Sequence, residues 1–441
     1  MNRTEAVIAA HRFGLGARPG QLDEIAQDPR GWLESQLDRV VAPPRTLAGL
    51  SSSVQAITAF SQMRGAEEED REMARVAARE HYRTEVTARM ETGAQTTKPF
   101  RERWVRFWTN HFTVSVTRNE VRSLAGAYER EAIRPRAMGR FGDLLFTAER
   151  HPAMQLYLDN VRSIGPDSPA GQRSGRGLNE NHAREILELH TLGVQGGYTQ
   201  GDVEALAAML TGWGLARGRK NDLPGGFVFD RIRHQPGSKN FLGQTFSEAG
   251  ENEGRRALEV LATHPSTAQF IARKLATHFV ADQPPAELVH RLAQTFVDTR
   301  GDLRALARTL IEDDTLWRRT RAKLRTPAEL VTATARALNY QDGAPMLRSV
   351  TYLGQIPFAA PSPQGWSDLA GDWLGPEAIV QRVEWAQTVG KQAADRVPDA
   401  RELAHELFGP TLSQRTDEAL KQTTGAEALS LLLASPEFQR R

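Results

Sequence analysis

Residues 179–194 read Asn-Glu-Asn-His-Ala-Arg-Glu-Ile-Leu-Glu-Leu-His-Thr-Leu-Gly-Val, and this stretch combines apolar positions at helical spacing with many ionisable groups. Ile186 and Leu189 lie on one side of the expected helix, while two histidines, three glutamates and one arginine occupy other positions. Solvated helices rarely need that mixture. The stretch therefore predicts a helix that carries either a functional site or a buried polar network.

Helical spacing continues on both sides of this stretch. Apolar residues recur at helical intervals within residues 205–210 and again within residues 303–311. The pattern changes where two short aromatic runs, Phe227-Val228-Phe229 and Phe241-Leu242, flank a Pro-Gly turn. We therefore predict a mainly α fold, a large helical domain with a small β-hairpin or extended insertion around residues 226–246.

The length of 441 residues exceeds the size at which a single core usually keeps growing. We expect one large helical domain over residues 1–441. It can be divided into an N-terminal helical part, 1–160, and a motif-bearing and C-terminal helical part, 161–441. Residues 65–92 are rich in Glu, Arg and Ala with few large apolar groups, which predicts a long exposed helix.

The composition excludes several classes of protein. Fifty-six Lys and Arg against 54 Asp and Glu leave a formal net charge of +2, so no positive surplus indicates a nucleic-acid partner. No run of about 18 apolar residues predicts a transmembrane helix. The N-terminus lacks the apolar segment of a signal peptide, which predicts a cytoplasmic protein. The absence of cysteine excludes disulfides and thiolate sites and is more usual in exported proteins, so the compartment stays open.

The 179–194 stretch holds the first candidate site. At about 100° per residue, Asn181, Arg184, Glu185 and Glu188 fall within one sector of a helix. If that face is buried, the arginine keeps one carboxylate ionised, while the other has a raised pKa or binds a metal. The alternative is a structural salt-bridge network in which Asn181 serves only as a helix cap.

The two histidines of the stretch have different expected roles. His190 joins the carboxylate face only if the helix ends or tightens near Gly193; alternatively it interacts with the helix C-terminus. His182 forms a His-x-x-Glu pair with Glu185, a spacing that some zinc sites use, but the HExxH metalloprotease motif is absent. His182 is therefore interpreted as incidental.

Two further groups carry candidate residues. Trp104, Trp108 and His111 lie along one helix face with Asn110 beside them, a pattern typical of a core. His111 could instead be a metal ligand, a haem ligand or a general base. The turn from His234 to Lys239 supplies an imidazole and an ammonium for a substrate contact.

Taken as a set, these motifs resemble the bacterial domain-of-unknown-function 1800 family, with matching pieces nearly from end to end. The pieces are His11 to Gly16, Phe107 to Phe112, Asn179 to Gln200, Leu210 to Trp213, His234 to Gly243, Leu353 to Gln355, Gly365-Trp366 and Ser435 to Phe438. The resemblance implies a helical protein but no established activity. It also implies an association with an envelope-associated hydrolase-like protein, and a periplasmic or exported location as the alternative to the cytoplasm.

The leading functional hypothesis is an acid/base or metal-dependent hydrolytic enzyme acting on an envelope-related substrate, with one shared pocket. Its candidate catalytic residues are His111, Arg184, Glu185 and Glu188, and candidate ligands of a divalent metal ion are His111, Glu185 and His190. Candidate substrate-binding residues are Asn110, Asn181, Trp213, His234 and Lys239. The alternatives are a noncatalytic assembly or accessory protein with a structural polar network, and a haem-binding oxidoreductase that uses His111 or His190.

Overall fold

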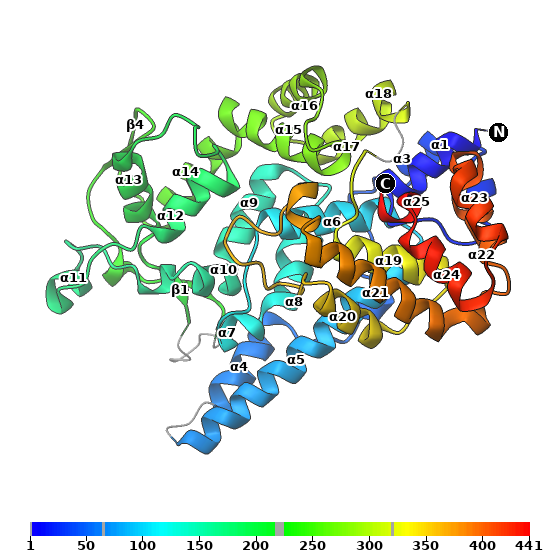
Figure 1. Cartoon of the computed structure of the whole chain (residues 1–441). Coiled ribbons are helices and arrows are strands. Elements are labelled where there is room, and N and C mark those ends of the chain that lie inside the picture. Colours follow the sequence, from blue (N-terminus) through cyan, green and yellow to red (C-terminus); the bar gives the residue numbers. More distant parts are fainter. Residues whose placement is uncertain (1, 64–66, 217–224, 319–321) are drawn as a thin grey trace.

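The computed structural model describes residues 2–63, 67–216, 225–318 and 322–441, and helices dominate all four ranges (Figure 1). This confirms the predicted mainly α fold. The first helices are α1 (Arg3–Ile8), α2 (Gln21–Ile25), α3 (Pro29–Glu34), α4 (Ser53–Met63), α5 (Glu68–Gln95), α6 (Pro99–His111), α7 (Asn119–Arg122), α8 (Ala125–Tyr128), α9 (Phe141–Arg150) and α10 (Pro152–Tyr157).

The remaining helices lie on both sides of α6, which runs near the middle of the molecule (Figure 1). The middle of the chain forms α11 (Pro169–Ser174), α12 (Asn181–Glu185), α13 (Gln200–Leu210), α14 (Glu251–Ala262), α15 (Pro265–Phe279), α16 (Ala286–Asp298), α17 (Leu303–Glu312) and α18 (Asp314–Trp317). The last part forms α19 (Pro327–Ala337), α20 (Gly343–Tyr352), α21 (Pro376–Ala393), α22 (Ala400–Phe408), α23 (Gln414–Lys421), α24 (Gly425–Ala434) and α25 (Pro436–Gln439). The two termini lie at the same end of the molecule (Figure 1).

The predicted long helix is α5, which projects from the body of the molecule together with α4 (Figure 1). Its outer half is largely exposed, as expected from its charged sequence, but from Glu85 onward it contributes buried residues to the body. Residues 65 and 66 of the predicted segment lie outside the described residues. No helix in the described ranges is long and apolar enough to cross a membrane.

Among the described residues, the strands form two small antiparallel pairs. Strand β1 (Trp213–Leu215) pairs with β2 (Phe227–Phe229), and β3 (Lys239–Phe241) pairs with β4 (Gln244–Phe246). The predicted insertion is therefore confirmed, although its two aromatic runs belong to different hairpins. In the tight turn between β3 and β4, Leu242 and Gly243 both have positive φ, as a two-residue hairpin loop requires.

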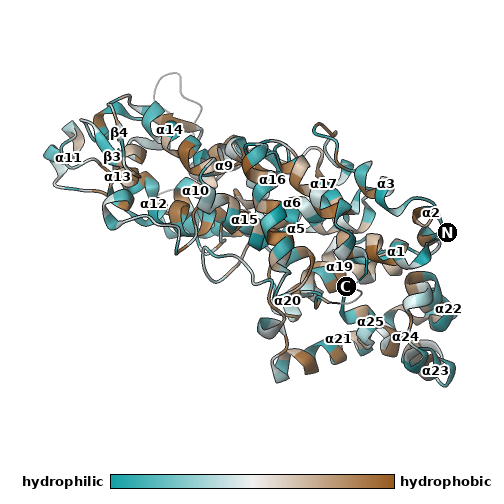
Figure 2. Cartoon of the chain, turned by 90° about the horizontal axis from the view of Figure 1, so that it is seen from above, coloured by the Kyte–Doolittle hydropathy of each residue, from teal (hydrophilic) through white to brown (hydrophobic). Residues whose placement is uncertain are grey.

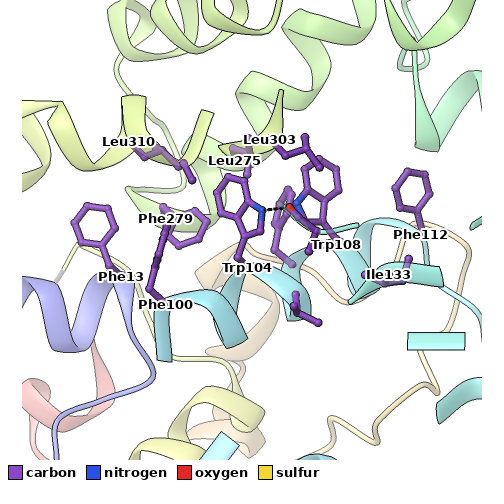
Figure 3. Packing of buried hydrophobic residues seen from close by; sticks show 14 of the residues in the cluster. Phe13, Phe100, Trp104, Trp108, Phe112, Ile133, Leu275, Phe279, Leu303 and Leu310 are labelled. Carbon is purple, nitrogen blue, oxygen red and sulfur yellow. Dashed lines mark hydrogen bonds between the residues drawn. The ribbon is translucent and has the colours of Figure 1, made fainter. Parts of the chain in front are cut away.

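One contiguous core of buried apolar side chains extends from Ala6 to Phe438. At its centre, aromatic residues of α6 pack against Leu275 and Phe279 of α15 (Figure 3). The indole of Trp104 is fully buried and donates from Nε1 to the carbonyl of Ala137 at 2.7 Å. The division of the chain at residue 160 stays a prediction.

Gly16 allows the N-terminal segment to approach α19 closely. Its φ is +106°, and a Cβ at this position would lie 2.9 Å from Cβ of Ala333. Its carbonyl accepts from Nε of Arg336 at 2.7 Å. Gly20 also has a positive φ of +74°, but a Cβ there would meet no atom within 4 Å.

This pair of glycines gives a matched test of the packing. Gly20→Ala carries only backbone strain and should lower the free energy of unfolding by about 1 kcal/mol. Gly16→Ala adds a clash with α19 and should lower it by about 2–4 kcal/mol, when strain and overpacking are added. Urea unfolding of both variants measures the difference. Equal losses would contradict the close approach of Gly16 to α19.

Candidate functional site

The 179–194 stretch forms α12 and then widens into a π-helical turn over Ile186–His190. On an uninterrupted α-helix, His182 and His190 would point about 80° apart, because eight residues rotate by about 800°. A π turn holds more residues per turn, so it reduces that angle. As a result, both imidazoles reach the same carboxylate. The helical part ends at His190, and Gly193 beyond it has a φ of +83°.

That carboxylate is Glu149 of α9. Its Oε2 lies 2.8 Å from Nε2 of His182, and its Oε1 lies 2.8 Å from Nδ1 of His190. All three side chains are 0% exposed. Burial acts to raise the pKa of Glu149, but the two histidines outweigh it and hold this pKa at about 2. His182, interpreted as incidental from the sequence, is therefore a full member of the buried cluster.

His111 lies next to this cluster at the end of α6. Its Nε2 is 3.1 Å from the carbonyl oxygen of His190, and the two imidazole centroids are 6.2 Å apart. Aromatic rings, including Trp108 and Phe112, surround it. Burial, and then Lys274 and His190, lower the pKa of His111 well below its ordinary value. His111 is therefore neutral at pH 7.

The predicted carboxylate face of α12 points outward and is only half-buried. Arg184 forms ion pairs with Glu180 at 3.0 Å and with Glu188 at 3.6 Å. Burial raises the pKa of Glu185, and Glu188 raises it further. Asn181 is exposed, and its Nδ2 donates to the carbonyl of Leu158 at 3.3 Å. These four predicted residues lie close together on one side of the helix, and His190 is near enough to Glu185 to oppose the rise of its pKa.

Two of the remaining predicted residues, His234 and Lys239, meet at Glu253 of α14. His234 Nε2 lies 3.0 Å from Oε1 of Glu253, and Lys239 Nζ lies 2.6 Å from Oε2. Burial raises the pKa of Glu253, but His234 and Lys239 outweigh it and hold this pKa at about 2. Trp213 is 1% exposed and packs edge-on against Phe146 and Phe227. This group joins the hairpins to α14.

The structure thus divides the predicted pocket into separate groups. Within the described ranges, no set of three or more His, Asp or Glu side chains is arranged to hold a metal ion. His190 directs Nδ1 at Glu149, and Glu185 is half-buried. The metal assignment stays a prediction.

A cavity of about 110 Å³ lies on the other side of α6. Arg103, Arg106, Phe107 and Asn110 face it at helical spacing, whereas Trp104, Trp108 and His111 face the core. Asn110 is the one sequence-predicted site residue in its wall. The other residues around it are Leu15, Arg89, Thr109, Thr113, Val114, His278, Thr326, Ala328, Glu329, Gln355, Pro357, Phe358, Ala360, Trp366, Ser367 and Asp368.

The segment from Gly354 to Gly375 closes one wall of this cavity. Asn110 holds it by two hydrogen bonds to Trp366: Nδ2 donates to the carbonyl at 2.8 Å, and Oδ1 accepts from the backbone N–H at 2.8 Å. A Cβ on Gly365 would lie 2.5 Å from the carbonyl oxygen of Asn110, so glycine is needed for this contact. Asn110 therefore positions the wall.

A histidine–carboxylate pair lies in the cavity wall. His278 Nδ1 is 2.7 Å from Oδ1 of Asp368, and both side chains are largely buried. The Nε2 atom of His278 is buried and has no hydrogen-bond partner among the described residues. Burial lowers the pKa of His278 and outweighs Asp368, which raises it. The imidazole is therefore neutral at pH 7.

A buried glutamate anchors another part of the cavity wall. Glu329 of α19 pairs with Nη1 of Arg103, and Arg441 contacts both of its carboxylate oxygens at 3.0 and 3.1 Å. Burial raises the pKa of Glu329, but Arg103 and Arg441 outweigh it and hold this pKa well below its ordinary value. Arg103 Nε also donates to the carbonyl of Gly14 at 2.7 Å.

Sequence reasoning missed five residues of these sites: Glu149, Glu253, His278, Glu329 and Asp368. Glu149 did leave a signal in the sequence, because it follows Leu145 by one helical turn and so lies on an otherwise apolar stripe. A carboxylate in that position needs a buried partner. The His278–Asp368 pair left none, because 90 residues and an irregular segment separate its members.

The family of the chain follows from a profile match over its sequence. The profile of the family described as "Protein of unknown function (DUF1800)" matches residues 8–440, nearly the whole chain. The chain belongs to this family. No curated protein and no solved structure matches it.

The Glu149 cluster predicts a specific loss of stability. Glu149→Gln leaves two buried imidazoles without their charged partner and should lower the free energy of unfolding at pH 7 by about 3–5 kcal/mol. Glu188→Gln, at a half-exposed position, should change it by less than about 0.5 kcal/mol.

The pH dependence of this loss follows from the depressed pKa. The stability that Glu149 contributes is fully present above about 4.5, its ordinary pKa, and is lost as the pH falls toward about 2. The difference between wild type and Glu149→Gln should therefore shrink over this range. Denaturant unfolding at several pH values measures it, and a pH-independent difference would contradict an ionised Glu149.

Proposed function

We propose that this protein is a hydrolytic enzyme that uses His278 as a general base in the cavity between α6, α15, α19 and the Gly354–Gly375 segment. The observation that carries the proposal is the His278–Asp368 pair in the wall of that cavity. An imidazole held at Nδ1 by a carboxylate and left without a partner at Nε2 is the arrangement that accepts a proton from a nucleophile.

The tautomer supports this role. A carboxylate at Nδ1 favours the proton on Nδ1, which leaves the lone pair on Nε2. The lowered pKa of His278 keeps the imidazole neutral, and therefore basic, at pH 7. Lys323 donates to the backbone carbonyl of Asp368 and forms an ion pair with Asp282 at 2.5 Å, so the backbone that carries the carboxylate is held in place. In this proposal water is the nucleophile, because a cavity of this size admits water.

The charge around the cavity favours an anionic substrate or transition state. Arg89, Arg103 and Arg106 line it, against the carboxylates of Glu329 and Asp368. Arg103 forms an ion pair with Glu329. The nearest carboxylate to Arg106 is that of Glu102, which is 3.7 Å away and also pairs with Arg134. Arg106 is therefore the cation best able to stabilise negative charge that develops in the cavity.

Hydrolysis of p-nitrophenyl acetate and p-nitrophenyl phosphate tests the proposal. Wild type should hydrolyse at least one of them, and His278→Gln should lower kcat about 10²–10⁴-fold because the general base is lost. The rate of wild type should stay constant at neutral pH and fall as the pH decreases through a value below 6.5, where His278 is protonated. His290→Gln, an exposed histidine on α16, is the matched control.

The enzyme proposal fails if purified wild type hydrolyses neither compound, or if His278→Gln and His290→Gln retain equal activity. In that case the second candidate, a noncatalytic accessory protein, takes its place. It is favoured by exposed apolar residues on one face of α21, Ile379, Val380 and Val383, which are 43–55% exposed. Helix α21 lies at the edge of the molecule in the view of Figure 2. An envelope-associated hydrolase-like protein is the proposed partner in that case.

A further inference from the structure

A second cavity, of about 180 Å³, lies between α19, α20 and α21, which lie close together near the C-terminal end (Figure 1). Apolar side chains, among them Val331, Leu338, Met346 and Val389, provide most of its lining. For comparison, an engineered apolar cavity of about 150 Å³ is large enough to bind benzene. This cavity can therefore hold a small apolar molecule.

The cavity is elongated along α21. Trp385 and Ala393 both line it, and eight residues of helix separate them by about 12 Å. Arg396, just beyond the end of α21, lines the same cavity and is exposed to solvent. The cavity thus extends from the buried indole of Trp385 to a solvent-exposed rim at Arg396.

Trp385 and Arg396 carry polar groups at the two ends of this lining. Trp385 is 5% exposed, and its Nε1 has no hydrogen-bond partner among the described residues. Arg396 lies with its guanidinium 5.2 Å from the centre of the Tyr340 ring, and no carboxylate in the described ranges forms an ion pair with it. The unpaired cation at the rim favours a ligand that carries an anionic group.

We infer that this cavity binds a medium-chain aliphatic carboxylate, with its chain between α19, α20 and α21 and its carboxylate at Arg396. The apolar lining accounts for the chain, and the elongated shape favours a linear molecule over a compact one. Charge complementarity with Arg396 selects an anionic head group over a neutral or cationic one. This site is separate from the His278 cavity and does not depend on the proposed hydrolysis.

Calorimetric titration with hexanoate, octanoate and decanoate tests the inference. Each added methylene that enters the cavity should strengthen binding about fourfold, since burying one contributes about 0.8 kcal/mol. Octanoate should bind more tightly than 1-octanol, and octylamine should bind most weakly. Equal binding of the three octyl compounds, or no dependence on chain length, would overturn the inference.

Variants locate the site. Arg396→Gln should weaken octanoate binding about tenfold and leave 1-octanol unchanged, because it removes only the charge at the rim. Arg348→Gln, which changes an exposed arginine of α20 outside the lining, should have no effect on either.

Ala335→Leu places a larger side chain in the cavity and should abolish binding of all chain lengths. Thermal unfolding checks that this variant is folded, and Ser349→Leu fills the cavity from α20 if it is not. Unchanged octanoate binding in Arg396→Gln, or in a folded cavity-filling variant, would overturn the inference.

Discussion

The ion pairs of Glu329 with Arg103 and Arg441 are the contacts on which the rest of the structure depends. A carboxylate buried at this depth is tolerated only when it is fully paired, because desolvation of an unpaired charge costs several kcal/mol. Satisfying Glu329 brings α6, α19 and the chain around Arg441 together. The backbone of Arg441 in turn pairs with that of Lys323 in both directions, at 2.8 and 3.1 Å. These segments are distant in sequence and together determine where the His278 cavity lies.

The same rule operates at two other places in the fold. Glu149 binds α9 to both ends of the α12 region through two imidazoles, and Glu253 binds α14 to the loop and strand of the second hairpin. In each case one buried glutamate pairs with two imidazole or ammonium groups from a motif elsewhere in the sequence. His182, His190, His234 and Lys239 of these motifs thus pair with buried glutamates. Arg184, Glu185 and Glu188 stay predicted site residues, and the catalytic proposal rests on His278 and Asp368.

Much of the fold could be predicted from apolar spacing, because a period near 3.6 residues distinguishes the faces of each helix. That period also separates Asn110, which lines the cavity, from His111, which faces the core. The spacing could not reveal the π turn at Ile186–His190, because backbone widening leaves no separate pattern in the sequence. Without that turn, the rotation of His190 relative to His182 is miscalculated. The His278–Asp368 pair was also beyond prediction, since an irregular segment brings Asp368 to α15.

The central claim is that His278 is a neutral base whose free nitrogen is Nε2. The ¹⁵N chemical shifts of histidine-labelled protein report the tautomer of each imidazole directly, and the spectrum of His278→Gln assigns the signals. The account predicts that His278 is neutral at pH 7, with the proton on Nδ1 and none on Nε2. A protonated imidazolium at pH 7, or a neutral ring with its proton on Nε2, would contradict it.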